Sequence, residues 1–346
     1  MYIRTPFALA LLVPMLCTAA VSAQRETPST PAAPSNISLA VVVTPKSGRP
    51  VADLQQQDFT IFDNKTPRPI TSFHAFGGSQ APIHILIVLD AVNVPYQSIA
   101  YSREEIDKFL HANGGQLAYP TQLAFFTDKG MQIQESFSTD GNELSSSLDH
   151  YAVALRDIRR SSQYQASDRF NLSIGALQSL SESQAKLPGR KLIFWVSPGW
   201  PLLSGPRIYL DDKQENQLFS MIVGLSTQMR EAAVTLYNIN PFGAAEGVGR
   251  EFYYESFLKG VSKASQAVIG DLSLQVLAAQ SGGLVLNGSN DLTALLEQSA
   301  ADGQAYYELS FDPPRADHPE EYHHIEVQVN RPGLTARTRQ GYYLQP

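Results

Sequence analysis

Ile83-His84-Ile85-Leu86-Ile87-Val88-Leu89 is the most informative segment of the sequence, and Asp90 follows it directly. A nearly continuous apolar run of this length is typical of a strand covered on both faces, because a strand with one wet face alternates apolar and polar residues. The run therefore predicts the first strand of a buried sheet. Similar apolar runs follow at 123–126, 192–196, 234–239 and 284–286.

Helix-length segments separate these apolar runs, at 98–112, 141–155, 168–185, 213–232, 266–281 and 290–301. Thr139-Asp140 and Ser167-Asp168 precede two of the segments and are residue types that cap helix N-termini. Buried strands that alternate with helices predict an α/β fold with a doubly wound, mostly parallel sheet of Rossmann-like architecture.

Both ends of the mature chain have a β pattern instead. Strands are expected within 37–76 and again at 306–311, 325–329 and 336–342. Neither group alone has enough apolar residues for a comfortable core, so we expect the two groups to join into one small β-sandwich. The predicted organisation is sandwich strands at 37–78, an α/β domain at 79–303 and completing sandwich strands at 304–346.

The first residues are typical of a secretory signal. Arg4 precedes an apolar run from Phe7 to Leu16, and Val21-Ser22-Ala23 resembles a cleavage site, so residues 1–23 are predicted to be removed. A retained membrane anchor is the alternative, but the run is shorter than the roughly 20 residues that span a bilayer. Residues 24–36 are rich in Pro, Ala and Ser and predict an extended linker.

Composition narrows the class of protein. The 346 residues are 43% hydrophobic and carry a net charge of −7, which is ordinary for a globular protein and unsuited to nucleic acid. The single cysteine, Cys17, lies in the predicted signal, so the mature chain is expected to have neither disulfides nor thiolate chemistry. No later segment has the length of a membrane span. We expect an exported protein, periplasmic or secreted, without a transmembrane segment.

Several short motifs, taken in order, resemble one family. They are Gly48-Arg49-Pro50-Val51-Ala52-Asp53-Leu54, Asp58-Phe59-Thr60-Ile61-Phe62-Asp63-Asn64, Gly189-Arg190-Lys191-Leu192-Ile193-Phe194-Trp195-Val196-Ser197, Gly282-Gly283, Tyr306-Tyr307-Glu308-Leu309, Arg331-Pro332-Gly333 and Arg339-Gln340-Gly341-Tyr342. With a strand ending at Asp90, they are similar to exported von Willebrand factor A-type domain proteins typical of Acidobacteria. The resemblance implies fold and export; it implies no defined activity.

The resemblance also implies a divalent cation at the carboxyl edge of the sheet, held by Asp-x-Ser-x-Ser, a Thr and a second Asp, as suits Mg²⁺ or Ca²⁺. This chain has Asp90-Ala91-Val92-Asn93-Val94, with valines at both serine positions and Pro198 in place of the second Asp.

The candidate metal ligands that remain are Asp90, Asn93 and Asp168, with Ser167 as the alternative to Asp168. Because most of the family's metal ligands are missing, we predict that the chain binds no cofactor, with Mg²⁺ or Ca²⁺ as the alternative. We expect the Asp90 carboxylate to cap the turn that follows it.

Each of two other polar clusters can be interpreted either as a binding site or as a solvated surface. His318, His323 and His324 stand near Glu320, Glu321 and Glu326, and they predict either a transition-metal site or, as we favour, a solvated acidic loop. Arg156, Arg159, Arg160 and Arg169 form a basic patch, either hydrated or bound to an anionic partner.

The chain lacks the Gly-x-Ser-x-Gly, His-Glu-x-x-His and phosphate-loop motifs, so we expect a non-enzymatic protein. Aromatic and apolar residues in two loops, Trp200, Leu202 and Leu203 and then Phe252, Tyr253 and Phe257, are predicted to contact an unidentified protein partner. The alternative is that these residues fold back over the sheet. The predicted function is binding or adhesion through the carboxyl edge of the sheet. A secreted hydrolase and a metal-dependent adhesion domain are the alternatives.

Overall fold

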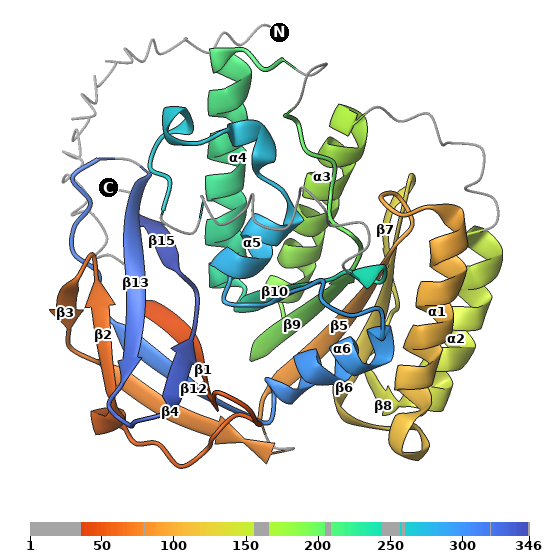
Figure 1. Ribbon diagram of the computed structural model, residues 1–346, viewed down its shortest axis with the longest axis horizontal. Coiled ribbons are helices and arrows are strands. Elements are labelled where there is room, and N and C mark those ends of the chain that lie inside the picture. The colour runs from red at the N-terminus through yellow and green to blue at the C-terminus, as the bar shows by residue number, and fades with distance from the viewer. Residues whose placement is uncertain are drawn as a thin grey trace, which may run out of the picture.

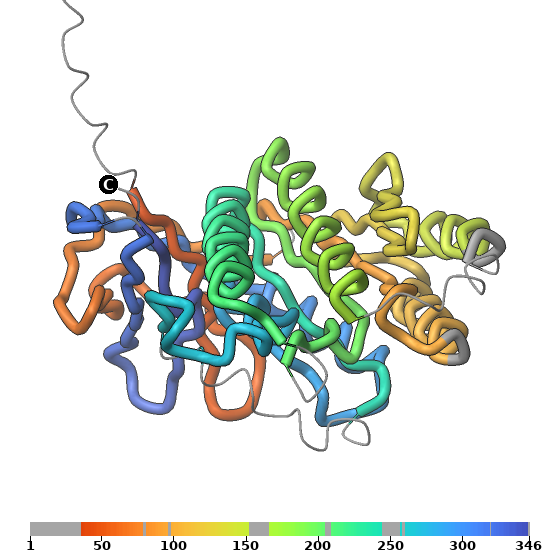
Figure 2. The backbone as a smooth tube through the Cα atoms, turned by 90° about the horizontal axis from the view of Figure 1, so that it is seen from above, coloured from red at the N-terminus to blue at the C-terminus, as the bar shows by residue number. Residues whose placement is uncertain are grey.

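The computed structural model describes residues 36–78, 81–155, 166–204, 209–243, 257, 260–318 and 320–344. In these ranges the chain forms one seven-stranded sheet, mostly parallel, and two four-stranded antiparallel sheets (Figure 1). The large sheet belongs to an α/β body, and Figure 2 shows the two small sheets together at one end of that body.

The large sheet is built from the predicted buried strands. β5 (Ile83–Asp90) lies at its centre between β6 (Gln116–Thr127) and β9 (Arg190–Val196), and all three run parallel. β10 (Val234–Ile239) and β11 (Val285–Leu286) extend the sheet beyond β9, again in parallel. Every residue of β9 is buried, including Arg190 and Lys191 at its start, and the apolar run from Leu192 to Val196 follows them. The expected doubly wound sheet is confirmed.

Two short strands of this sheet were not predicted. β7 (Gly130–Ile133) and β8 (Ser138–Asp140) both run antiparallel to β6, and β7 forms the edge of the sheet. The tight turn at Asp128-Lys129 reverses the chain within two residues. Strands of three or four residues are too short to give a periodic signal in the sequence.

Helices cover both faces of the large sheet. They are α1 (Tyr96–His111), α2 (Gly141–Leu155), α3 (Ala166–Ala185), α4 (Asp212–Glu231), α5 (Leu274–Gln280) and α6 (Leu292–Ala301). One buried cluster joins the sheet to α3, α4 and α5, and a second joins the opposite face to α1, α2 and α6 (Figure 1).

The helix predicted at 266–281 was wrong in its first half. Only Leu274–Gln280 is α-helical, and the residues before it form single 3-10 turns at Ala264–Gln266 and Ile269–Asp271. The backbone of Gly270 lies against another loop, because a Cβ built there would come within 2.5 Å of the Leu203 carbonyl oxygen. This tertiary contact overrides the local helical pattern.

The sandwich joins the two ends of the chain, as expected. In one sheet β12 (Ala305–Phe311) lies between β1 (Ile37–Pro45) and β4 (Ser72–Gly77), with β14 (Leu334–Arg337) on the far side of β1. The second sheet has the order β15 (Gly341–Leu344), β13 (Glu321–Val329), β2 (Phe59–Asp63) and β3 (Thr66–Arg68). A third hydrophobic cluster fills the space between these sheets.

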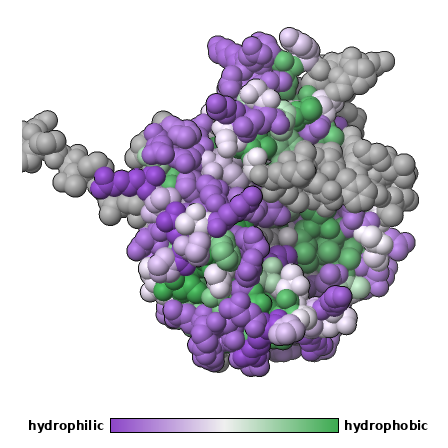
Figure 3. Space-filling view, turned by 60° about the vertical axis from the view of Figure 1, so that its left-hand side comes forward, coloured by the Kyte–Doolittle hydropathy of each residue, from purple (hydrophilic) through white to green (hydrophobic). Residues whose placement is uncertain are grey.

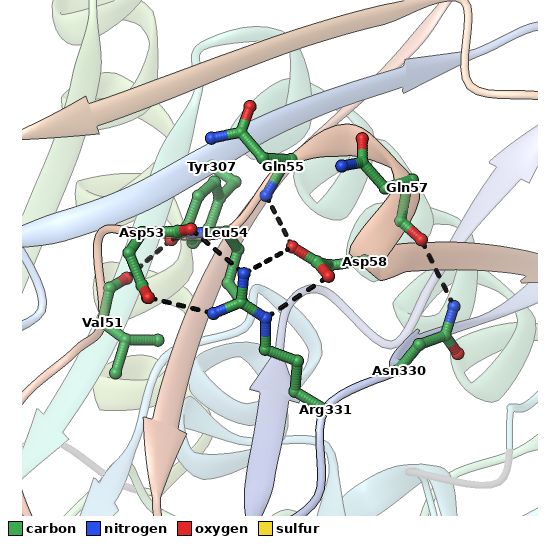
Figure 4. A network of polar contacts seen from close by, with 9 residues as sticks. All are labelled: Val51, Asp53, Leu54, Gln55, Gln57, Asp58, Tyr307, Asn330 and Arg331. Atoms are coloured by element: carbon green, nitrogen blue, oxygen red, sulfur yellow. Dashed lines mark hydrogen bonds and ion pairs between the residues drawn. The ribbon is translucent and has the colours of Figure 1, made fainter.

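A polar clamp holds the loop before β2 against the end of β13 (Figure 4). Arg331 forms ion pairs with Asp53 at 2.9 Å and Asp58 at 3.1 Å. The Tyr307 hydroxyl accepts a hydrogen bond from the Leu54 amide at 3.1 Å and donates one to the Val51 carbonyl at 2.8 Å. Motif residues behind the family resemblance therefore meet in space, where they join the two halves of the sandwich.

Within the described ranges, none of the helices combines the length and apolar character needed to traverse a bilayer.

Candidate functional site

The candidate site lies at the carboxyl edge of the large sheet, where β5 and β9 end side by side. The chain leaves β5 for α1 on one face and leaves β9 for α4 on the other. Such a divergence of connections opens a crevice where doubly wound sheets bind ligands. Asp90 ends β5 at this point and is fully buried.

The Asp90 carboxylate accepts four hydrogen bonds. Oδ1 accepts from the backbone amides of Val92 and Asn93, both at 2.9 Å. Oδ2 accepts from the Asn93 side-chain amide at 2.8 Å and from the Trp195 indole Nε1 at 2.9 Å. Burial raises the pKa of Asp90, and these four donors oppose that rise. The expectation that Asp90 caps the following turn is confirmed.

This arrangement leaves little of Asp90 for a cation. A carboxylate has about four lone-pair directions, and each Asp90 oxygen already receives two donors. Val92 and Val94, at the positions of the family serines, pack against the hydrophobic clusters on opposite faces of the sheet. The residues present therefore do not fit the divalent cation that the resemblance implies.

The structure brings together only part of the candidate ligand set. Asn93 is adjacent to Asp90 and donates from its side chain to Ser173 Oγ of α3 at 2.9 Å. The Asn93 Oδ1 atom is buried and has no hydrogen-bond partner among the described residues. Asp168 is exposed in the first turn of α3, and no described contact joins it to Asp90 or Asn93. Sequence reasoning missed Ser173 and Trp195, which no local motif links to Asp90.

The prediction that Trp200 contacts a partner is wrong, because its side chain is only 1% exposed. The ring packs edge-on against Trp195, with centroids 5.4 Å apart, and against Phe170 at 6.2 Å. The Trp200 carbonyl also accepts a hydrogen bond from Ser273 at 3.2 Å. The loop after β9 folds back over the sheet, as the alternative interpretation had it.

The structure describes three of the other five residues that were predicted to contact a partner. Leu203 and Phe257 are buried, which contradicts their prediction as contact residues, and Leu202 is partly exposed. Phe252 and Tyr253 lie outside the described residues.

Two exposed apolar residues were missed. Tyr209 is 88% exposed and Val268 is 61% exposed, more than any other large hydrophobic residue that the structure describes. Tyr209 precedes Asp211, the N-cap of α4, so it belongs to no helical face. An aromatic residue just before a predicted helix was the signal in the sequence that could have identified it. Val268 was assigned to a helix that does not form there.

The loop that contains Val268 is hydrogen-bonded to the loop that contains Leu202 and Leu203. The Leu203 amide donates to the Gly270 carbonyl at 2.6 Å, and the Ser204 hydroxyl donates to Asp271. The turn Ile269–Asp271 also contacts α4. Leu210 and Ala267, the neighbours of Tyr209 and Val268, pack against the same hydrophobic cluster. Leu202 and Val268 lie on the two joined loops, and Tyr209 lies two residues before the α4 N-cap, Asp211; we call these three residues the α4 patch.

The histidine cluster does not form a metal site. In the described part of the chain, no three His, Cys, Asp or Glu side chains gather in a group that could hold a metal. His323 is buried rather than solvated, with Nδ1 2.7 Å from Asp63 and Nε2 3.3 Å from Glu321. The second contact is an ion pair without hydrogen-bond geometry. Of the predicted basic patch, only Arg169 lies in the described residues.

Comparisons with known proteins yield only remote structural similarity. No protein-family profile and no curated protein matches the chain. It is similar to the human COPII-coat protein Sec24c, with 11% identity and a TM-score of 0.39 over 79% of this chain and 46% of that one.

Two further solved structures are similar at the same low level. The pilus adhesin SpaC from Lactobacillus rhamnosus GG has 8% identity and a TM-score of 0.37 over 83% of this chain and 42% of that one. The manganese-loaded TRAP protein from Plasmodium vivax has 9% identity and a TM-score of 0.33 over 78% and 96%. At such scores these likenesses carry no functional argument.

Proposed function

We propose that this chain is an exported, non-enzymatic A-type module that binds a protein partner through the carboxyl edge of its large sheet. The A-type assignment is supported by the short family-like motifs and by the central position of β5, which ends at Asp90. Export is supported by the signal-like pattern from Arg4 to Ala23.

The observation that carries the proposal is the exposure of the α4 patch. Hydrophilic side chains predominate on the face shown in Figure 3, and apolar ones gather in separate patches. Tyr209 at 88% and Val268 at 61% are the most exposed large hydrophobic residues that the structure describes. Tyrosine is enriched among the residues that dominate binding energy at protein interfaces. The loop that carries Val268 is bonded to the loop that carries Leu202, and Leu210, next to Tyr209, packs on the core, which supports the proposal that these side chains present a surface to a partner.

The proposed binding is independent of Mg²⁺ and Ca²⁺, since the Asp90 oxygens are already occupied by four donors. This separates it from metal-dependent adhesion, which chelation would abolish. A secreted hydrolase would instead show turnover that one polar substitution removes.

The test is photo-crosslinking in the native cells, with benzoylphenylalanine in place of Tyr209 or Val268. Lys65, which is exposed in the sandwich, is the control position. We expect one partner band from positions 209 and 268, none from 65, and no effect of chelators. Tyr209→Ala should weaken binding of that partner about tenfold or more. Equal labelling at all three positions would reject the patch, and a mature N-terminus other than Gln24 would reject the assigned cleavage.

A further inference from the structure

The outer side of β7 is an open sheet edge. β7 pairs with β6 in antiparallel register, with Met131 opposite Phe126 and Ile133 opposite Ala124. The Gln134 amide donates to the Leu123 carbonyl at 2.9 Å, which makes that pair a hydrogen-bonded one. Because such pairs alternate along an antiparallel ladder, the backbone groups of Met131 and Ile133 point away from β6. No described residue bonds to them.

A groove lies beside this edge, between β7 and α3. Its volume is about 570 Å³, and its lining is mostly apolar. Met131 forms one side, and Leu172, Gly175 and Ala176 of α3 form the other. A Cβ built on Gly130 or on Gly175 would meet no atom within 4 Å, so the glycines leave the space open. An apolar side chain could enter here without displacing the core.

One carboxylate also lines the groove. Asp168, exposed at the start of α3, is among its lining residues. The whole chain carries a net charge of −7, so its field favours a basic partner segment over an acidic one.

We propose that β7 accepts an extended segment of a partner chain as an added strand, with an apolar side chain in the groove and a basic residue beside Asp168. The amide and carbonyl groups of Met131 and Ile133, to which no residue in the described part of the chain bonds, supply the backbone pairing that such recognition uses. The groove supplies specificity for alternate side chains. This site is separate from the α4 patch, and either can fail without the other.

The first experiment measures binding of a synthetic peptide to the full chain by calorimetry. The probe is a peptide of about eight residues that alternates valine with threonine and carries one terminal lysine. Its control has the same side chains but N-methyl groups on alternate amides, which blocks strand pairing. We expect about tenfold weaker binding of the control, since at least two backbone hydrogen bonds are lost. Replacing the lysine by glutamate should also weaken binding.

The second experiment fills the groove from the protein side. Gly175→Leu places a side chain in the open space, whereas Gly224→Leu does so on an equally open position of α4. Both changes improve helix propensity in the same way, so they match in their effect on folding. We expect Gly175→Leu to lower the affinity for the peptide about tenfold or more, and Gly224→Leu to leave that affinity unchanged.

Hydrogen exchange locates the added strand directly. Peptide binding should slow exchange at the Met131 and Ile133 amides. Three outcomes would overturn the proposal: no binding of the alternating peptide at about 1 mM, equal binding of the N-methylated peptide, or equal effects of the two glycine variants. Protection of the Met131 and Ile133 amides without peptide would overturn it too, because the edge would then be covered by this chain or a second copy.

Discussion

At the scale of single residues, the partners of Asp90 determine its role. The same carboxylate that reads as a metal ligand in the sequence accepts hydrogen bonds from Asn93 and from Trp195, which lies 105 residues later. An asparagine side chain could not replace it. Each Asp90 oxygen accepts from two N–H groups, so the amide nitrogen of asparagine would face two donors in either orientation.

We therefore expect Asp90→Asn to lower the free energy of unfolding by about 2 kcal/mol, the usual cost of leaving buried donors unsatisfied. Urea denaturation measures the change, and Asp168→Asn, at an exposed position, should stay within about 0.5 kcal/mol of the parent. An Asp90→Asn variant as stable as the parent would contradict this account of the site. Calorimetric titration of the parent with Mg²⁺ or Ca²⁺ should give no heat of binding.

His323 is the second residue whose environment sets its chemistry. Burial lowers the pKa of His323, but the ion pairs with Asp63 and Glu321 outweigh it, so its pKa lies above the ordinary value. Arg68 and the Tyr342 hydroxyl also contact Asp63, at 3.3 Å and 3.1 Å. With a carboxylate near each ring nitrogen, the folded protein favours the imidazolium.

Stability should consequently depend on pH in one direction. The folded state binds the His323 proton more tightly than the unfolded state does. The stabilisation from protonated His323 is therefore complete below the unfolded pKa of about 6.5, and it is lost as pH rises through the folded pKa. Denaturation midpoints from pH 5 to pH 9, roughly, measure it. His323→Gln should flatten that part of the profile, and His74→Gln, at an exposed position, should not. A parent profile that rises with pH over this window argues against the imidazolium.

At the scale of elements, the sandwich strands depend on a long loop between β1 and β2. Leu54 of this loop is buried in the sandwich core and Val51 packs against that core, while the Tyr307 hydroxyl and Arg331 hold the loop by polar contacts (Figure 4). Hydrogen bonds from Gln55 and Arg331 keep the pKa of Asp58 below its usual range, so the clamp stays charged at neutral pH.

Tyr307→Phe should remove both bonds of the hydroxyl and leave the Leu54 amide without its partner. We expect a loss of about 1–2 kcal/mol in the free energy of unfolding, measured by chemical denaturation. Tyr306→Phe is the matched control, since the adjacent ring mainly stacks on Phe76 and lies under Arg190. Equal losses in the two variants would mean that the hydroxyl bonds contribute nothing specific.

At the scale of the whole molecule, a buried polar contact joins the α/β body to the sandwich. Asp302, at the end of α6, accepts a hydrogen bond from the Tyr237 hydroxyl of β10 at 2.5 Å and pairs with Arg337 of β14. Arg337 also donates to the Gly282 carbonyl, and Arg190 of β9 lies 5.0 Å from the ring centre of Tyr306 in β12. We expect these contacts to couple the unfolding of the two bodies.

The parent should therefore unfold in a single calorimetric transition. Asp302→Asn, which leaves the partly buried Arg337 without its counter-charge, should lower the free energy of unfolding by about 2 kcal/mol. Asp149→Asn, which breaks an exposed pair with Arg103, should cost less than about 1 kcal/mol. Two separate transitions in the parent would show that the bodies fold independently.

The elements with a strong local pattern could be predicted from the sequence alone. The strands β5, β6, β9 and β10 and most of the helices follow from apolar runs and periodicity, because burial on both faces demands apolar residues whatever the neighbours are. The union of the two chain ends followed from their lack of sufficient core.

Only the tertiary structure decided the site. Trp200 is buried because Phe170 and Trp195 face it, and Tyr209 is exposed because no element that the structure describes covers it. Asp90 became a hydrogen-bond acceptor because β9 places Trp195 beside β5. Exposure and bonding at a loop depend on residues far away in the chain, and the local pattern of a sequence carries no record of them.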